Sequence, residues 1–184
     1  MVVAATKRMT VAEFQALPEA AGDFDFELQR GEVVPMTRPK LKHAIIQRRL
    51  FKLLEAAAES RGWLDTELAF RPLPEHELRA ADVAFVRQDR FAAADPEDNI
   101  AGSPDLIIEV LSPSNSASEM YEREELCLAT GCSEFWVVDS ERETVRVAKP
   151  GGSFAFYHRD QEIPLALFGG GTLAVNSIFP TTAK

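Results

Sequence analysis

The pattern of apolar and polar positions is most informative over residues 104–111, which read PDLIIEVL. Side chains of an extended strand alternate between two faces, so Glu109 shares one face with Ile107 while Ile108 lies on the other. Both faces are mainly apolar, which is typical of a strand covered on both sides in the centre of an α/β sheet. A carboxylate in that environment is costly to desolvate without a proton, a cation or a metal beside it. Glu109 is therefore predicted to have a partner.

The preceding N-terminal part of the chain predicts a short helix and a β-hairpin. Thr10 and Glu13 have the S/T-x-x-E spacing of a capping box, and they open an apolar run that Pro18 closes. Two strands are then expected, at 24–28 and 32–36, around a turn that contains a glycine. These elements form a unit ahead of the first long helix.

That helix is predicted over 41–60, because apolar residues recur there at intervals of three and four. The stripe expected to face the core consists of Ile46, Leu50, Leu53, Leu54, Ala57 and Ala58. His43 lies three residues before this stripe and starts it. A lone inward histidine is usually a hydrogen-bonded structural group, so a structural role is favoured over a catalytic one. For Glu27, on the first hairpin strand, a solvent-facing position is favoured in the same way.

The rest of the chain predicts a mixed sheet with helices on its faces. The expected elements are strands at 63–70, 82–86, 104–111 and 134–139, a helix at 118–130, and a hairpin of outer strands over 144–158. The stretch 88–103, rich in Asp, Ala and Pro, is predicted to be a loop. Ile178 and Phe179 are expected to cap the core. This order of elements favours an α/β (α+β) fold.

The composition indicates one globular domain over residues 1–184, since 46% of the residues are hydrophobic and 27% are charged. No apolar run approaches the roughly 18 residues of a membrane span, and the first residues lack the apolar core of a signal peptide. We therefore expect a cytoplasmic protein that does not contact a membrane. Cys127 and Cys132 have no second Cys or His pair nearby, so they are predicted to be packing residues rather than zinc ligands.

The charge pattern sets one basic stretch against an acidic background. The formal net charge is −9, which as a whole repels nucleic acid. Between Glu32 and Glu55, however, there are six cationic residues and no acidic ones. Three of the cationic residues lie off the apolar stripe of the predicted helix, namely Arg48, Arg49 and Lys52. A basic face of this kind can contact phosphates, but the pattern alone favours a solvated helix face.

Five segments of the chain, taken in order, carry a resemblance to a known family. They read MTVAEFQALPE, FELQRGEVVPM, ADVAFV, PDLIIEVLSPSNSASEM and GCSEFWVVDSERETVRV, and His43 opens its helix between the second and the third. In this order and spacing they resemble the Uma family of restriction endonucleases, which is part of the PD-(D/E)XK nuclease superfamily. The resemblance covers nearly the whole chain. It implies a restriction-endonuclease-like core, with a mixed central β-sheet flanked by helices and an N-terminal β-hairpin.

The resemblance also implies the catalytic residues. Asp82 would stand for the first acidic residue of the family's motif and Glu109 for the second, and together they would hold Mg²⁺ (or Mn²⁺). The metal would activate a water molecule and neutralise charge that develops on the scissile phosphate of DNA. It would also supply the partner that Glu109 requires. His43 and Glu27 are weaker candidates for a catalytic role.

One catalytic position departs from the family's pattern. The superfamily's lysine normally follows the second acid by two positions, where this chain has Leu111, and in Uma-type sequences a lysine lies on the following helix, where this chain has Arg123. Arginine keeps the positive charge and can stabilise the transition state, but it does not lose its proton and so cannot act as a general base. The alternative for Arg123 is an ion pair with Glu119 on the same helix. The sequence leaves both interpretations open.

Three functions remain in competition. The first is magnesium-dependent hydrolysis of DNA by a homodimer, since cutting two strands suits two active sites, and the acidic pair Asp82 and Glu109 favours it. The second is a catalytically weak or inactive nuclease fold that acts as a nucleic-acid-binding or regulatory module, which Arg123 and the acidic net charge favour. The third, a hydrolase of another phosphate ester, is disfavoured because the sequence has no glycine loop that would cradle a phosphate.

Overall fold

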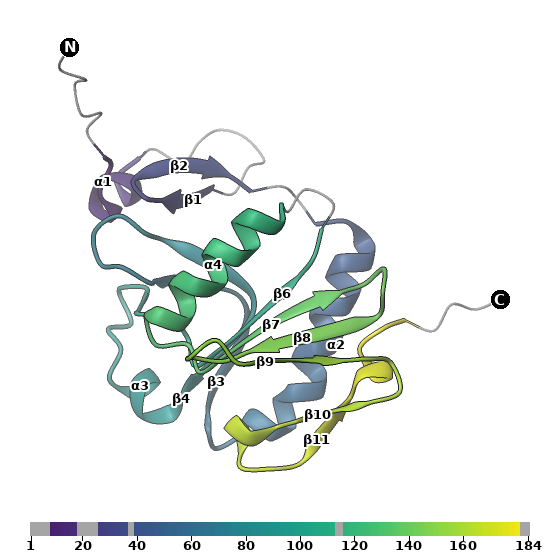
Figure 1. Ribbon diagram of the computed structural model, residues 1–184. Helices are drawn as coiled ribbons and strands as arrows, with labels where there is room; N and C mark the ends of the chain where they lie inside the picture. Colours follow the sequence, from purple (N-terminus) through teal and green to yellow (C-terminus); the bar gives the residue numbers. More distant parts are fainter. Residues whose placement is uncertain (1–7, 18–25, 37–38, 113–115, 181–184) are drawn as a thin grey trace.

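A seven-stranded β-sheet forms the centre of the computed structural model, which describes residues 8–17, 26–36, 39–112 and 116–180 (Figure 1). The strand order is β5-β3-β4-β6-β7-β8-β9. The strands are β3 (Gly62–Arg71), β4 (Arg79–Arg87), β5 (Ile100–Ala101), β6 (Leu106–Val110), β7 (Glu134–Asp139), β8 (Thr144–Ala148) and β9 (Phe154–Tyr157). β6 pairs antiparallel with β4 and parallel with β7, so the sheet is mixed, as predicted. Every residue of β6 is buried, which confirms that the strand carrying Glu109 is central.

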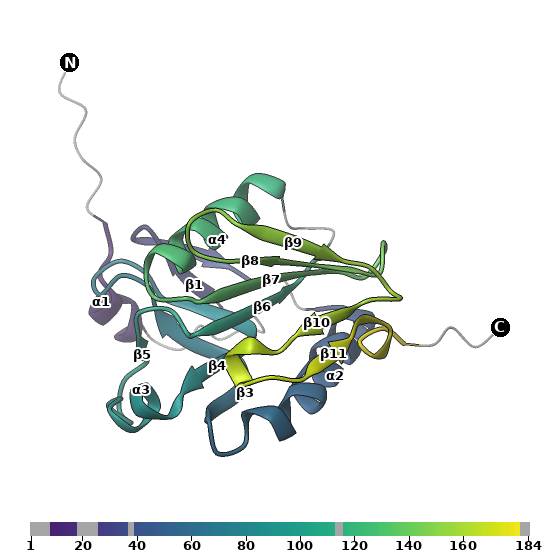
Figure 2. The same cartoon turned by 60° about the horizontal axis from the view of Figure 1, so that its bottom comes forward.

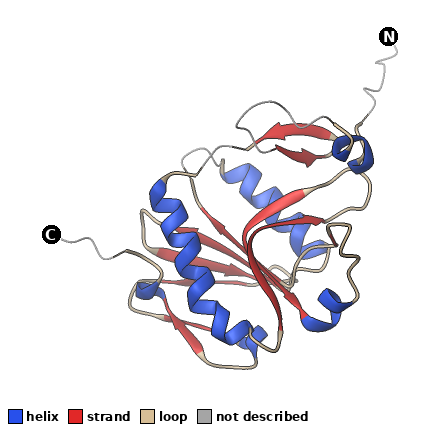
Figure 3. Ribbon diagram, turned by 180° about the vertical axis from the view of Figure 1, so that it is seen from behind, coloured by secondary structure: helices blue, strands red, loops and turns tan. Residues whose placement is uncertain are grey.

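Two helices cover opposite faces of this sheet. α2 (Leu41–Ala58) lies behind the sheet in Figure 1 and in front of it in Figure 3, whereas α4 (Ala117–Ala129) covers the other face. The buried residues on the side of α2, called the α2-side cluster below, include Ile46, Leu50, Leu54, Val83, Phe85 and Ile108. Those on the side of α4, the α4-side cluster, include Phe70, Ala81, Ile107, Cys127 and Cys132. Because each large apolar side chain that is fully buried contributes about 1.5–3 kcal/mol, these contacts hold both helices in place.

The N-terminal elements pack at one end of the sheet (Figure 1). α1 (Val11–Gln15) begins with the predicted capping box of Thr10 and Glu13. β1 (Phe26–Gln29) and β2 (Glu32–Pro35) form the predicted hairpin. An isolated bridge joins Leu28 of β1 to Leu78, directly before β4. The hairpin is therefore attached to the strand that carries Asp82.

The C-terminal elements extend the core on the side of α2 (Figure 2). β10 (Glu162–Pro164) and β11 (Thr172–Ala174) form a small antiparallel sheet of their own. Ile178 and Phe179 are fully buried in the α2-side cluster, so the prediction that they cap the core is confirmed. Within the described ranges, no helix is long and apolar enough to cross a membrane.

The stretch 88–103 is more ordered than the predicted loop. It contains α3 (Gln88–Ala92) and the short strand β5. The ring of Phe91 stacks on that of Trp63 with centroids 4.8 Å apart, and Ile100 is buried beside Phe70 of β3. Tertiary contacts with β3 thus create structure that the Asp, Ala and Pro content of this stretch does not predict.

The inward stripe of α2 also differs from its prediction. Leu53, expected in the core, is 37% exposed, whereas the polar Gln47 is buried. Gln47 tolerates burial because its side-chain amide donates hydrogen bonds to the backbone carbonyl of Asp82 and to Glu67. The buried face of α2 therefore includes Gln47 and excludes Leu53.

Candidate active site

Asp82 and Glu109 occupy facing positions on neighbouring strands. β4 and β6 pair antiparallel as far as Val83 and Ile108, and the next position outward on each strand is Asp82 and Glu109. Here Oδ2 of Asp82 accepts a hydrogen bond from the backbone N–H of Val110 at 2.7 Å. The Asp82 carboxylate is thereby held directly against β6.

The side-chain alternation of β4 inverts at Asp82, which lies inside the strand rather than opening it. Val83 and Phe85 pack in the α2-side cluster, but Ala81 packs in the α4-side cluster. Residues two apart in a regular strand share a face, so the alternation of β4 is interrupted between Ala81 and Val83. At this interruption the carboxylate of Asp82 contacts the backbone of β6.

α2 brings two side chains to the same point. Nε2 of His43 lies 3.0 Å from Oδ2 of Asp82, and Gln47, one turn later, donates to the Asp82 carbonyl at 2.8 Å. Burial lowers the pKa of His43, but the hydrogen bond and charge of Asp82, together with the charge of Glu67, outweigh burial and raise that pKa above its ordinary value. His43 thus contacts the first candidate metal ligand. Gln47 was not predicted from the sequence as a site residue, although its spacing of four from His43 places both on one helix face.

Glu109 lies against a guanidinium group from the opposite helix. Only 8% of Glu109 is exposed, and Nη2 of Arg123 on α4 lies 2.9 Å from its Oε1. Burial, reinforced by the charges of Asp82 and Glu27, outweighs Arg123 and raises the pKa of Glu109 to about 8. No well-directed hydrogen bond reaches Oε1 from the described part of the chain. Glu109 therefore has a cationic neighbour and still has acceptor capacity.

Arg123 is fixed by contacts with two further residues. Its Nη1 lies 3.0 and 3.1 Å from the two carboxylate oxygens of Glu27, and its Nη2 donates to the backbone carbonyl of Ala80. Glu119, the alternative partner, bonds to Ser116 at the start of α4. The guanidinium group thus points at the sheet and the candidate site.

The prediction that Glu27 faces solvent is wrong, because only 3% of the residue is exposed. The backbone N–H of Ala80 donates to its Oε1 at 2.9 Å, and Nη1 of Arg79 lies 3.5 Å from its Oε2. Burial raises the pKa of Glu27, but Arg123, followed by the Ala80 N–H and Arg79, outweighs burial and holds that pKa below its ordinary value. Glu27 is buried because the hairpin folds onto β4, a tertiary contact that the alternation within β1 does not reveal.

The basic residues of α2 lie apart from this cluster of side chains. Arg48 and Lys52 are exposed, as predicted. Arg49 is not fully exposed, because its Nη1 donates to the backbone carbonyl of Phe179 at 2.6 Å. The C-terminal segment that covers this part of α2 therefore removes Arg49 from the predicted basic face.

The charges around Glu109 fit a divalent cation. Glu109 shares the guanidinium group of Arg123 with Glu27, and within the described ranges Oε1 of Glu109 lacks a well-directed donor. Asp82 lies on the neighbouring strand, so a cation between the two strands would find a carboxylate on each. The described residues contain no preformed group of three His, Cys, Asp or Glu that could hold a metal. Mg²⁺ does not require one, because it is usually held by one or two carboxylates and completes its shell with water and substrate phosphate oxygens. Asp82 and Glu109 are the residues that would hold it.

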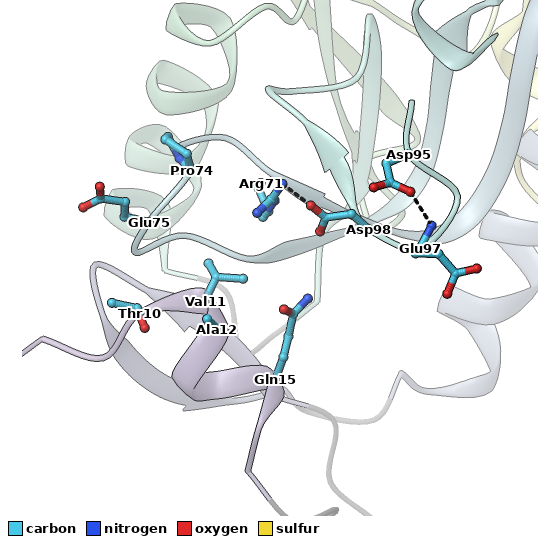
Figure 4. A pocket seen from close by; sticks show the side chains of 10 residues that line it. All are labelled: Thr10, Val11, Ala12, Gln15, Arg71, Pro74, Glu75, Asp95, Glu97 and Asp98. Carbon is cyan, nitrogen blue, oxygen red and sulfur yellow. Dashed lines mark hydrogen bonds and ion pairs between the residues drawn. The ribbon is translucent and has the colours of Figure 1, made fainter. Parts of the chain in front are cut away.

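A separate hollow of about 400 Å³ lies between α1 and the loops around Pro74 and Glu97 (Figure 4). Its lining carries the carboxylates Glu75, Asp95, Glu97 and Asp98, and Arg71 is paired with Asp98. None of the predicted site residues lines it. Its negative charge makes it unsuited to a phosphate group.

A solved structure shares this architecture. It is described as a "putative nuclease belonging to DUF820 from Anabaena variabilis ATCC 29413", and it matches with a TM-score of 0.78 and 22% sequence identity over 93% of this chain and 97% of that chain. The fold is accordingly that of a restriction-endonuclease-like protein. No curated protein matches the chain.

The sequence itself assigns the family. The family model Uma2, described as "Putative restriction endonuclease", matches residues 11–180. The chain belongs to the Uma2 family, which confirms the resemblance drawn from its motifs.

Proposed function

We propose that the protein is an endonuclease that hydrolyses DNA phosphodiester bonds with Mg²⁺ or Mn²⁺ as cofactor. The observation that carries this proposal is the convergence of Asp82 and Glu109 on adjacent strands with the guanidinium group of Arg123 against Glu109. The free acceptor capacity of Glu109 Oε1 within the described residues supports a cationic cofactor, and the family supports a nuclease.

Each residue has a role that follows from its contacts. Asp82 and Glu109 would hold the cation, which supplies water activation and charge neutralisation when bound. Arg123 stays protonated beside Glu109, so it can stabilise negative charge on the phosphate oxygens but cannot accept the proton of the attacking water. His43 orients the Asp82 carboxylate through its Nε2 contact. Glu27 holds Arg123 in place from the hairpin.

The proposal includes DNA as substrate and a homodimer as the active assembly. Double-strand cleavage suits two copies of the site, one for each strand. Arg48 and Lys52 form an exposed basic pair on α2 that can contact phosphates outside the site. Sedimentation of the protein with and without a DNA duplex tests the assembly, and a protein that stays monomeric in both would contradict it.

The decisive experiment is nicking of supercoiled plasmid DNA. Wild-type protein should nick with Mg²⁺ or Mn²⁺ and not with EDTA, and Asp82→Asn and Glu109→Gln should each abolish nicking because each removes a metal ligand. Glu55→Gln, on the exposed side of α2, serves as a charge-matched control that retains activity. Activity that survives in EDTA or in Glu109→Gln would contradict the proposal.

A second function, a nucleic-acid-binding or regulatory module with little activity, is favoured by one observation. Arg123 stands where Uma-type sequences carry a lysine, and its guanidinium group is already engaged by Glu27, Glu109 and Ala80. This function predicts DNA binding without nicking on supercoiled, linear and single-stranded DNA. The plasmid assay combined with a binding assay on the same DNA separates the two functions.

A further inference from the structure

Three acidic residues stand in one row across three neighbouring strands. The pairs on either side of Glu67 in β3 place it opposite Asp82 of β4, and the register of β4 with β6 places Glu109 beyond Asp82. Only Asp82 and Glu109 were predicted from the sequence. Glu67 therefore lies at the same level of the sheet as the candidate metal ligands.

The backbone of Glu67 is strained, although this residue lies inside a β-strand. Four non-glycine residues in the described ranges have φ in the left-handed region, and three of them, Arg30, Ser60 and Glu143, lie in turns. Glu67, with φ of 54°, lies in the middle of β3. A residue with a Cβ adopts this conformation at an energetic cost, and such strain is concentrated at functional sites.

The side-chain alternation of β3 inverts near Glu67, as that of β4 inverts at Asp82. Leu64 packs against the α2-side cluster, but Leu68 and Phe70 pack in the α4-side cluster, so the alternation of β3 inverts between Leu64 and Leu68. β3 and β4 thus change faces at the same level, one at Glu67 and the other at Asp82. The inversion directs the Glu67 side chain to the face of α2.

Gln47 connects the two strands at this level. Its buried Nε2 donates both to a carboxylate oxygen of Glu67 and to the backbone carbonyl of Asp82, the latter at 2.8 Å. A side-chain NH₂ group has two protons, so both bonds can form at once. The Glu67 carboxylate is therefore held in a fixed position relative to Asp82, although Glu67 itself is exposed at the surface.

We propose that Glu67 is a positioning residue of the active site, whose carboxylate accepts hydrogen bonds from water carried by the cation that Asp82 and Glu109 hold. Mg²⁺ keeps several of its waters when bound by two carboxylates, and these waters require acceptors around the site. Glu67 meets that requirement because it is ionic, exposed and anchored by Gln47. An outer position also agrees with the fact that Glu67, Asp82 and Glu109 do not form a preformed three-residue metal group among the described side chains. This inference rests on the proposed function.

The experiment uses three variants of the full chain. Glu67→Gln keeps the size of the side chain and removes its charge. Glu67→Asn removes the charge and also relieves the backbone, because Asn tolerates left-handed φ better than Glu. Ser60→Asn is the control for the backbone effect, since Ser60 has φ of 66° and lies in the turn after α2, away from the site. Each protein is measured by thermal melting in EDTA, by calorimetric titration with Mn²⁺ and by rate of plasmid nicking.

A positioning role predicts a loss of activity without a comparable loss of stability. Ser60→Asn should melt a few degrees higher than the wild type, since relief of about 1 kcal/mol shifts a chain of this size by about 2–4 °C. Glu67→Asn gains the same relief but gives up the hydrogen bond from the buried Gln47, so its melting temperature should stay near that of the wild type. Both Glu67 variants should nick about 10–100-fold more slowly, as expected for loss of an outer partner of a metal site. The Kd for Mn²⁺ should change much less than the rate, and Ser60→Asn should nick as the wild type does.

Three outcomes would overturn the assignment. Glu67→Asn that melts many degrees below the wild type, with Ser60→Asn above it, would show that Glu67 serves the fold rather than the site. Mn²⁺ binding and nicking that are unchanged in Glu67→Gln would remove Glu67 from the site while leaving the proposed function intact. Wild-type protein that neither binds Mn²⁺ nor nicks DNA would overturn the proposed function and this role of Glu67 together.

Discussion

Both carboxylate oxygens of Glu27 lie within 3.1 Å of Nη1 of Arg123, although the two residues are 96 positions apart in the chain. Nη2 of the same guanidinium group contacts Glu109. Glu27 thus links the N-terminal hairpin to the candidate active site through Arg123. The hairpin is part of the site's architecture rather than an appendage of the sheet.

Glu27→Gln should reduce nicking by about 10–100-fold, because the guanidinium group loses the carboxylate that orients it. It should also lower the melting temperature, since removing one partner of a buried ion pair costs about 3–5 kcal/mol. Glu77→Gln is the matched control, because Glu77 is equally buried but its contacts are Arg79 and the backbone N–H of Arg30. If Glu77→Gln loses as much activity as Glu27→Gln, and the two variants are equally stable, Glu27 has no specific role in the site.

Arg123→Lys should lose activity rather than gain it. The guanidinium group contacts Glu27, Glu109 and the Ala80 carbonyl at once, and a single ammonium group cannot reproduce this fork. Plasmid nicking and Mn²⁺ titration of the two proteins measure the effect. A lysine variant that nicks faster than the wild type would instead identify the arginine as a degraded form of the family's lysine, and would favour the binding-module function.

The metal-free protein should lose stability as the pH rises from 4.5 to 8. Burial raises the pKa of Glu109 from 4.5 to about 8, so folding favours its protonated form, and this contribution is fully present below pH 4.5 and is lost as the pH rises through 8. Glu109→Gln should therefore flatten the pH dependence of stability and melt higher than the wild type at pH 8 in EDTA. Urea unfolding at several pH values measures the free energy of unfolding of each protein, with Glu55→Gln as control. An unchanged slope in Glu109→Gln would contradict the effect.

Asp82→Asn, unlike Glu109→Gln, should not raise the melting temperature in EDTA. Its carboxylate accepts the Val110 N–H and lies 3.0 Å from His43, so its charge is already compensated in the folded protein. We expect stability in EDTA to stay level or fall. A rise equal to that of Glu109→Gln would show that repulsion between the two carboxylates dominates instead.

The basic pair on α2 should contribute to DNA affinity through its attraction to phosphates. In the inactive Glu109→Gln background, replacing Arg48 and Lys52 by Ala should reduce the slope of log K against log salt concentration by about one for each phosphate that is no longer neutralised. Arg49→Ala should leave this slope unchanged and lower stability, because Arg49 bonds to the Phe179 carbonyl. Fluorescence anisotropy at several salt concentrations gives the slope. A slope that responds only to Arg49 would reverse this assignment.

The sequence predicted the parts of the fold that depend on local pattern. The alternation around Glu109 identified a strand buried on both faces, and the recurrence of apolar residues at three and four identified the long helix α2. Contacts between distant segments could not be predicted from local pattern. Glu27 alternates in β1 like a solvent-facing residue and is buried only because the hairpin folds onto β4. The sequence marks Glu67 as an ordinary strand residue, and its left-handed backbone lies where the ladder between β3 and β4 skips one pair.

The metal, the DNA substrate and the homodimer stay predictions, as does the extent of the domain over residues 1–184. The carboxylate oxygens of Asp82 and Glu109 suit both Mg²⁺ and Mn²⁺, so the site does not distinguish between the two ions.

The separation between Glu27 and Arg123 has a consequence for how the protein folds. Contacts between residues so far apart in sequence form slowly, because a long loop must close first. During synthesis the hairpin leaves the ribosome well before α4, and β6 still lacks its neighbour β7 at the moment Arg123 emerges. We therefore expect the carboxylate of Glu27 to remain hydrated until late, and the catalytic centre to be among the last regions of the chain to acquire its native contacts.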